Sequence, residues 1–175
     1  MMLSRRNFIF VGMAGAAALV AARFLPRTVP ASSDALGANG VALMSALAPV
    51  MLDGALPTAP NERADALRET LTGVDRAVAG LTPRQQGELT DLFALLALAP
   101  ARWSLAGTNA AWNEAPREDI ERFLDRLRDS RVELLRAAYD ALHQLVMAAW
   151  YGNPRAWPAI GYPGVPTLAT SERAS

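Results

Sequence analysis

Residues 132–149 read VELLRAAYDALHQLVMAA, and their pattern is the clearest indication of the fold class. Apolar side chains recur here at alternating steps of three and four residues, which places them on one face of an α-helix. This stripe consists of Val132, Leu135, Tyr139, Leu142, Val146 and Ala149. Bundled helices bury stripes of this kind against one another. The stretch therefore predicts a long helix with one buried face.

Four more helices are predicted before this one, from the same periodicity and from start and stop signals. The first begins at Val41, contains Pro49 as a candidate kink and ends at Asp53-Gly54; the second runs from about Asn61 to Ala79; the third runs from Pro83 to near Pro100; the fourth begins near Pro116. Residues 101–116 are expected to be irregular. No alternating strand pattern occurs. We expect an all-α fold, a single bundle of about five helices with an irregular aromatic, Gly- and Pro-rich C-terminal segment.

Two short motifs indicate helix starts. Thr82, Pro83 and Gln85 combine an N-cap, a proline at the first helical position and the partner of a capping box. Ser130 and Glu133 have the same spacing as Thr82 and Gln85. The second motif either starts a new helix or lies inside one long helix that begins near Pro116.

Composition excludes several classes of protein. The 175 residues suit one domain plus a targeting segment. Cysteine is absent, which excludes disulfides, thiolate metal sites, covalently attached haem and a cysteine nucleophile. Formal net charge is zero, but without the first 31 residues 13 arginines face 17 acidic residues, a net of −4. An acidic domain is unsuited to nucleic acid, so no nucleic-acid partner is predicted.

The N-terminus matches a twin-arginine export signal, in which two arginines precede an apolar run. The signal residues are Ser4, Arg5, Arg6, Phe8 and Ile9. The apolar run 8–22 is shorter than a membrane span, and small residues place cleavage after Ala31. The twin-arginine translocase, which carries folded proteins, is thus a predicted partner and the periplasm the predicted location. If cleavage fails, the signal tethers the chain to the membrane.

These features divide the chain into a signal peptide (1–31), a linker (32–40) and a helical domain (41–175) that includes an aromatic tail (150–166). The tail carries Trp150, Tyr151, Trp157 and Tyr162 among glycines and prolines. These rings either plug the end of the bundle or form a docking surface, because Trp and Tyr are enriched at interface hot spots. Trp112 is a further docking candidate.

Chemistry-bearing motifs are scarce. His143 is the single histidine, with Asp140 three residues before it, and one such pair does not make a metal site. His143 is either a structural or interface residue or a catalytic one. The alternating charges of residues 117–129 indicate an ion-paired, solvated helix face or an acidic docking surface. No catalytic, cofactor-binding or metal-binding residue is predicted.

Three stretches resemble a known family. Residues 148–152 (AAWYG) and 157–164 (WPAIGYPG), together with 47–51 (LAPVM), resemble the small, third-subunit family of gluconate 2-dehydrogenase and related membrane-associated flavin dehydrogenases. The resemblance implies that a large partner subunit carries FAD and performs the chemistry. It also implies that a cytochrome c subunit often passes the electrons on. In that family the small subunit carries the export signal and helps the flavoprotein mature.

Three functions are therefore weighed. The first is a non-catalytic accessory subunit that binds, matures and co-exports a FAD-dependent dehydrogenase of the sugar or alcohol type. The second is a stand-alone periplasmic helical protein with a binding or structural role. The third is an enzyme centred on His143, which requires a concave pocket with several polar groups converging on that side chain.

Overall fold

The computed structural model describes residues 35–164. The export signal, the cleavage position after Ala31, the first linker residues and the last two tail residues lie outside this range. The described residues are all-α, without a strand, as predicted. The helices are α2 (Gly37–Met51), α3 (Pro60–Ala79), α4 (Pro83–Ala97), α5 (Ala99–Leu105), α6 (Arg117–Arg128) and α7 (Glu133–Tyr151), with 3-10 turns η1 (Trp112–Glu114), η2 (Pro154–Ala156) and η3 (Pro158–Ile160).

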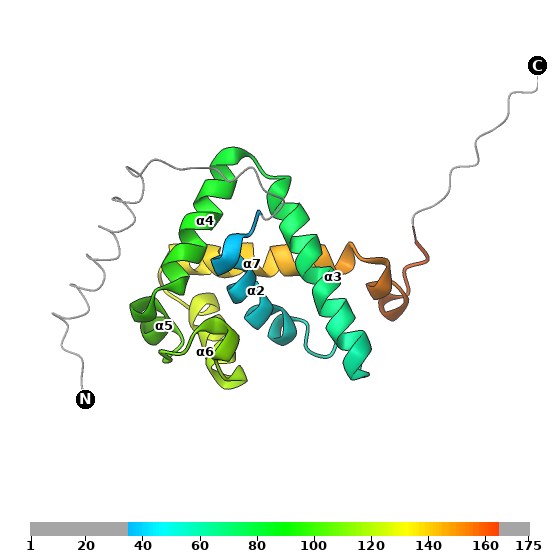
Figure 1. Ribbon diagram of the computed structural model, residues 1–175, viewed down its shortest axis with the longest axis horizontal. Helices are drawn as coiled ribbons and strands as arrows, with labels where there is room; N and C mark the ends of the chain where they lie inside the picture. Colours follow the sequence, from blue (N-terminus) through cyan, green and yellow to red (C-terminus); the bar gives the residue numbers. More distant parts are fainter. Residues whose placement is uncertain (1–34, 165–175) are drawn as a thin grey trace, which may run out of the picture.

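Helix α2 is the centre of the fold. It contacts α3, α4, α6, α7 and η1. Its residues Leu43, Met44 and Leu47 are fully buried, because neighbours surround the helix on several sides. In Figure 1, α3 and α4 diverge from the turn that joins them, α2 lies between them, and α7 crosses behind.

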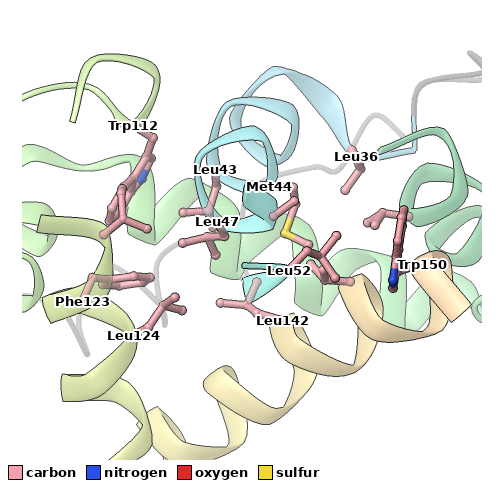
Figure 2. Packing of buried hydrophobic residues seen from close by; sticks show 14 of the residues in the cluster. Leu36, Leu43, Met44, Leu47, Leu52, Trp112, Phe123, Leu124, Leu142 and Trp150 are labelled. Atoms are coloured by element: carbon pink, nitrogen blue, oxygen red, sulfur yellow. The ribbon is translucent and has the colours of Figure 1, made fainter. Parts of the chain in front are cut away.

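The core extends along α2 from an aromatic pair at one end to a single tryptophan at the other (Figure 2). At one end Trp112 packs on Phe123 of α6, with ring centroids 4.8 Å apart and planes tilted by 54°. At the other end Trp150 of α7 is 2% exposed and lies near Leu36. Leu142 of α7 is fully buried between them. Residues from both halves of the sequence thus share one core.

Two glycines permit close packing of the helices. A Cβ on Gly40 of α2 would lie 2.9 Å from the Phe93 ring of α4, and one on Gly73 of α3 would lie 3.0 Å from Cβ of Ala149 on α7. Both distances are shorter than ordinary van der Waals contact. Side chains at these positions would push the paired helices apart.

Several predicted elements are confirmed. Helix α3 begins one residue before the predicted start and ends at Ala79 as predicted. The capping box at the start of α4 is formed: the Gln85 backbone N–H donates to Thr82 Oγ1, and the Thr82 N–H donates to Gln85 Oε1 at 3.1 Å. Helix α2 continues through Pro49 to Met51. None of the helices within residues 35–164 is long and apolar enough to cross a membrane.

The predicted linker 32–40 is wrong at its C-terminal end. Helix α2 begins at Gly37, and Leu36 and Gly40 are buried. The Leu36 N–H donates to the carboxylate of Asp75 on α3 at 2.9 Å. This long-range hydrogen bond fixes the start of the helix, where the local sequence of small and polar residues suggested a linker.

The prediction of an irregular segment over 101–116 is also wrong in part. Helix α5 occupies Ala99–Leu105, and with it the described residues contain six α-helices. Pro100 lies in the first turn of α5, where its missing N–H costs nothing, rather than at the end of the preceding helix. The chain then passes through η1 before α6.

The second capping-box motif does not form. Helix α6 ends at Arg128, and α7 begins at Glu133 without a side-chain cap. Ser130 Oγ instead accepts from the Val132 N–H within the connecting turn. Val132 precedes the helix and is exposed, so its place in the apolar stripe was wrong. The buried face of α7 consists of Ala138, Leu142, Val146 and Trp150.

Candidate docking surface at the C-terminal segment

The chain turns sharply where α7 ends. The Gly152 N–H donates to the Ala148 carbonyl at 2.9 Å, which closes the last helical turn. Asn153 then starts η2, because its Oδ1 accepts from the Arg155 N–H at 2.9 Å and Pro154 occupies the first position. Local signals thus redirect the chain immediately after the helix.

A polar latch, formed by Glu69, Asn153 and Arg155, holds this turn against α3. Arg155 donates to both carboxylate oxygens of Glu69, at 2.8 and 3.1 Å, and Asn153 Nδ2 donates to the same carboxylate at 2.8 Å. The hydrogen bonds from Arg155, and then the one from Asn153, lower the pKa of Glu69 from 4.5 to about 2. The carboxylate therefore stays ionised at neutral pH, and the latch stays charged.

Aromatic contacts order the rest of the segment. Trp157 Nε1 donates to the Tyr151 carbonyl at 3.0 Å. The Trp157 and Tyr162 rings meet edge to face, with centroids 5.2 Å apart. Gly161 between them has φ +69°, a left-handed conformation that lets the chain reverse. The reversal places Tyr162 back over Trp157.

Apolar and aromatic side chains remain at the surface of this ordered segment. Tyr151 is 44% exposed and Tyr162 is 43% exposed, Ile160 is also exposed, and Trp157 is half-buried. We call these four residues the tail surface. Aromatic residues held rigidly at a surface lose little entropy when a partner covers them, which favours docking.

The other two candidate docking residues lie in the core. Trp112 is 4% exposed, and its Nε1–H donates to the Leu96 carbonyl near the end of α4 at 2.9 Å. Trp150 is packed on the buried face of α7. Of the five aromatic candidates, Tyr151, Trp157 and Tyr162 are brought together, whereas Trp112 and Trp150 serve the core.

His143 is half-buried on α7 and stacks on Tyr139, with ring centroids 5.6 Å apart. No hydrogen bond joins it to Asp140. Residues 35–164 contain no group of three or more His, Asp or Glu side chains placed to hold a metal ion.

The described surface includes two open grooves beside the docking segment and α2, and His143 lines neither of them. One, of about 350 Å³, lies between α2 and α6 and includes Ser45, Pro49 and Asn113. The other, of about 390 Å³, lies beside the latch and includes Gly73, Ala149 and Asn153. Both are open to solvent.

The charged helix α6 forms the ion pairs that its spacing predicts. Arg117 pairs with Glu121 at 2.7 Å, and Arg122 pairs with Asp119 at 2.6 Å. Arg117 also reaches Asp53 after α2, at 2.8 Å. The face is solvated, as expected for pairs at three- and four-residue spacing.

Two features of the structure were not predicted. The latch residues were missed because Glu69 and Arg155 meet only in the folded chain. The Asn-Pro pair after Gly152 was a signal for the capped turn, but it gave no indication that the turn contacts Glu69. Helix α5 was missed with its exposed Trp103.

Comparison of the chain with protein-family models, with curated proteins and with solved structures finds no match. Any functional proposal therefore depends on the chain's own residues and on the geometry described above.

Proposed function

We propose that the chain is a non-catalytic accessory subunit. It binds a FAD-dependent dehydrogenase of the sugar or alcohol type, assists its maturation and carries it through the twin-arginine pathway to the periplasm. FAD belongs to the partner, and a cytochrome c subunit can complete the assembly. The observation that carries the proposal is the tail surface, formed by residues of the same segment that resembles the dehydrogenase small subunits.

The geometry of this surface supports a docking role. A tail that only plugged the core would bury its rings, yet both tyrosines and Ile160 remain exposed. The latch to Glu69 and the Trp157 hydrogen bond hold these side chains in place before any partner arrives. Preorganisation of this kind reduces the entropy lost on binding.

The alternative is a stand-alone periplasmic helical protein with a binding or structural role. The burial of Trp112 and Trp150 favours it, because it expects the aromatic residues mostly in the core. The two proposals differ in what the exposed rings do, so they can be separated by testing capture of a partner.

The first test is recovery of the tagged full chain from its native host without harsh detergent, followed by absorbance spectroscopy and mass identification. We expect a co-purifying flavoprotein. The double variant Ile160→Ser/Tyr162→Ser should lose it. The matched control Val41→Ser changes an exposed apolar residue on α2 and should retain it.

Export is tested separately with Arg5→Lys/Arg6→Lys, which alters the signal and leaves the tail surface intact. The flavoprotein should then fail to reach the periplasm while still binding the chain in the cytoplasm. Recovery of the chain alone, with folding intact, would favour the stand-alone alternative.

A further inference from the structure

Pro49 leaves a backbone carbonyl of the central helix without its usual partner. It lies inside α2, which continues through it to Met51. Proline has no backbone N–H, so the carbonyl of Ser45, four residues earlier, loses its helical hydrogen bond. The Ser45 hydroxyl also forms no hydrogen bond within residues 35–164. Both oxygen atoms of Ser45 are thus free to accept from a donor outside the helix.

Ser45 and Pro49 line the open groove of about 350 Å³ between α2 and α6. Ala46 and Val50 of α2 and Ile120 of α6 add apolar side chains to its wall. The acceptors of Ser45 therefore lie beside apolar side chains. Because the groove is open to solvent, it suits one side chain of a larger partner better than a small molecule, which a pocket would enclose.

Asn113 of η1 provides a further acceptor in the same groove. It is exposed, and its side chain forms no hydrogen bond with any other residue of the described range. Its amide oxygen can accept from two donors. Together with the two oxygen atoms of Ser45, it favours a ligand whose polar end carries several donors.

Charge beside the groove favours a cation. Arg117 lines it, but its guanidinium already binds two carboxylates, that of Asp53 at 2.8 Å and that of Glu121 at 2.7 Å. One positive charge is thus outnumbered by two negative charges. Glu114, next to Asn113, has no ion pair in the part of the chain that the structure describes, and it adds a third. Excess negative charge repels an anionic ligand and attracts a cationic one.

We infer that this groove binds a lysine side chain presented by a partner protein. The aliphatic stem packs on Val50 and Ile120, and the ammonium group donates to the oxygen atoms of Ser45 and Asn113. Lysine suits these acceptors better than arginine, because a compact ammonium group has three donors that reach separate acceptors, whereas a planar guanidinium matches a carboxylate. This contact is distinct from the tail surface and does not require that the partner be a flavoprotein.

The first test is an NMR titration of the full chain with three blocked tripeptides, Ala-Lys-Ala, Ala-norleucine-Ala and Ala-(acetyl-lysine)-Ala. Norleucine keeps the aliphatic stem without the ammonium group, and acetyl-lysine keeps a polar end without the charge. Only the lysine peptide should shift the signals of Ala46, Asn113 and Ala115 in a saturable way, and added salt should weaken its binding. Equal binding of the norleucine peptide, or no binding of the lysine peptide, would overturn the inference. Tighter binding of free butylammonium than of the lysine peptide would assign the groove to a small amine and overturn the docking role.

The second test changes the acceptor itself. Pro49→Val restores the backbone N–H that pairs with the Ser45 carbonyl, keeps an apolar side chain of similar size and improves helix propensity, so the protein should fold. The dissociation constant of the lysine peptide should rise about fivefold. Pro60→Ala is the matched control, because Pro60 occupies the first turn of α3 and leaves no carbonyl without a partner. An unchanged dissociation constant in Pro49→Val would overturn the inference.

The third test changes the charge. Glu121→Gln removes one of the carboxylates beside the groove and should also weaken binding of the lysine peptide severalfold. Glu88→Gln removes a carboxylate that is paired in the same way with Arg84 on α4, which does not line the groove, and should leave binding unchanged. Equal effects of the two variants would show that only the overall charge of the domain matters, and would contradict a lysine site in this groove.

Discussion

Arg155 and Glu69 are 86 residues apart in the sequence, yet the guanidinium of Arg155 donates to both carboxylate oxygens of Glu69. This pair joins the turn after α7 to the middle of α3. It determines where the C-terminal segment lies and, through it, where the tail surface is presented.

Glu69→Gln should loosen that segment without unfolding the protein. The amide keeps one acceptor oxygen but loses the charge that binds Arg155 and Asn153. Hydrogen exchange should therefore accelerate severalfold in residues 153–164 and stay constant in α2. Glu88→Gln, which alters a comparable exposed pair with Arg84 on α4, is the control and should leave that segment unaffected.

Acid should release the latch within a defined range of pH. The pKa of Glu69 is lowered in the folded chain, so its contribution is complete above its ordinary value of 4.5 and is lost as the pH falls towards about 2. Exchange in residues 153–164 measured between these limits should rise as the pH falls, after correction for the intrinsic exchange rate. The same series in Glu69→Gln should be flat; a parallel rise in both proteins would contradict the assignment.

Truncation of two neighbouring aromatic residues should change the free energy of unfolding by very different amounts. Trp150→Ala removes a buried ring and should lower the free energy of unfolding by about 3–5 kcal/mol. Tyr151→Ala removes an exposed ring and should change it by less than about 0.5 kcal/mol, because only its carbonyl bonds to Trp157. Urea denaturation measures both. Similar losses would show that Tyr151 is part of the core.

Gly40→Ala should destabilise the fold although alanine is the better helix former. The new methyl group would lie 2.9 Å from the buried Phe93 ring. Overpacking costs about 1–3 kcal/mol, which exceeds or cancels the roughly 1 kcal/mol gained in helix propensity. Thermal unfolding should show a lower Tm than for Gly80→Ala, where the nearest atom is 3.5 Å away. A higher Tm for Gly40→Ala than for Gly80→Ala would mean that α4 shifts to accommodate the new methyl group at little cost.

Local signals in the sequence predicted helix boundaries well at the positions where such signals occur. Thr82 and Gln85 fixed the start of α4 through contacts three residues apart. The motif at Ser130 had the same spacing but formed a different turn. A local sequence pattern is thus sufficient to predict the start of a helix when the residues of the motif complete the cap by themselves.

The other errors have a different cause, which is contact between distant residues. Helix α2 begins early because Asp75 accepts the Leu36 N–H from across the fold. Helix α5 has no buried face, so no apolar periodicity could reveal it. The aromatic candidates could not be divided by sequence either, since Trp112 and Tyr162 differ only in what the rest of the chain places over them.

The bond between Leu36 and Asp75 also determines how the domain bears mechanical load. A pull on the residues before Leu36 reaches this bond and the buried Leu36 side chain before it reaches the first turn of α2. Tension is thereby shared with α3 instead of unwinding the central helix from its end. The domain should therefore resist unravelling when it is drawn by its N-terminal segment, and Asp75→Ala should lower the force at which it yields.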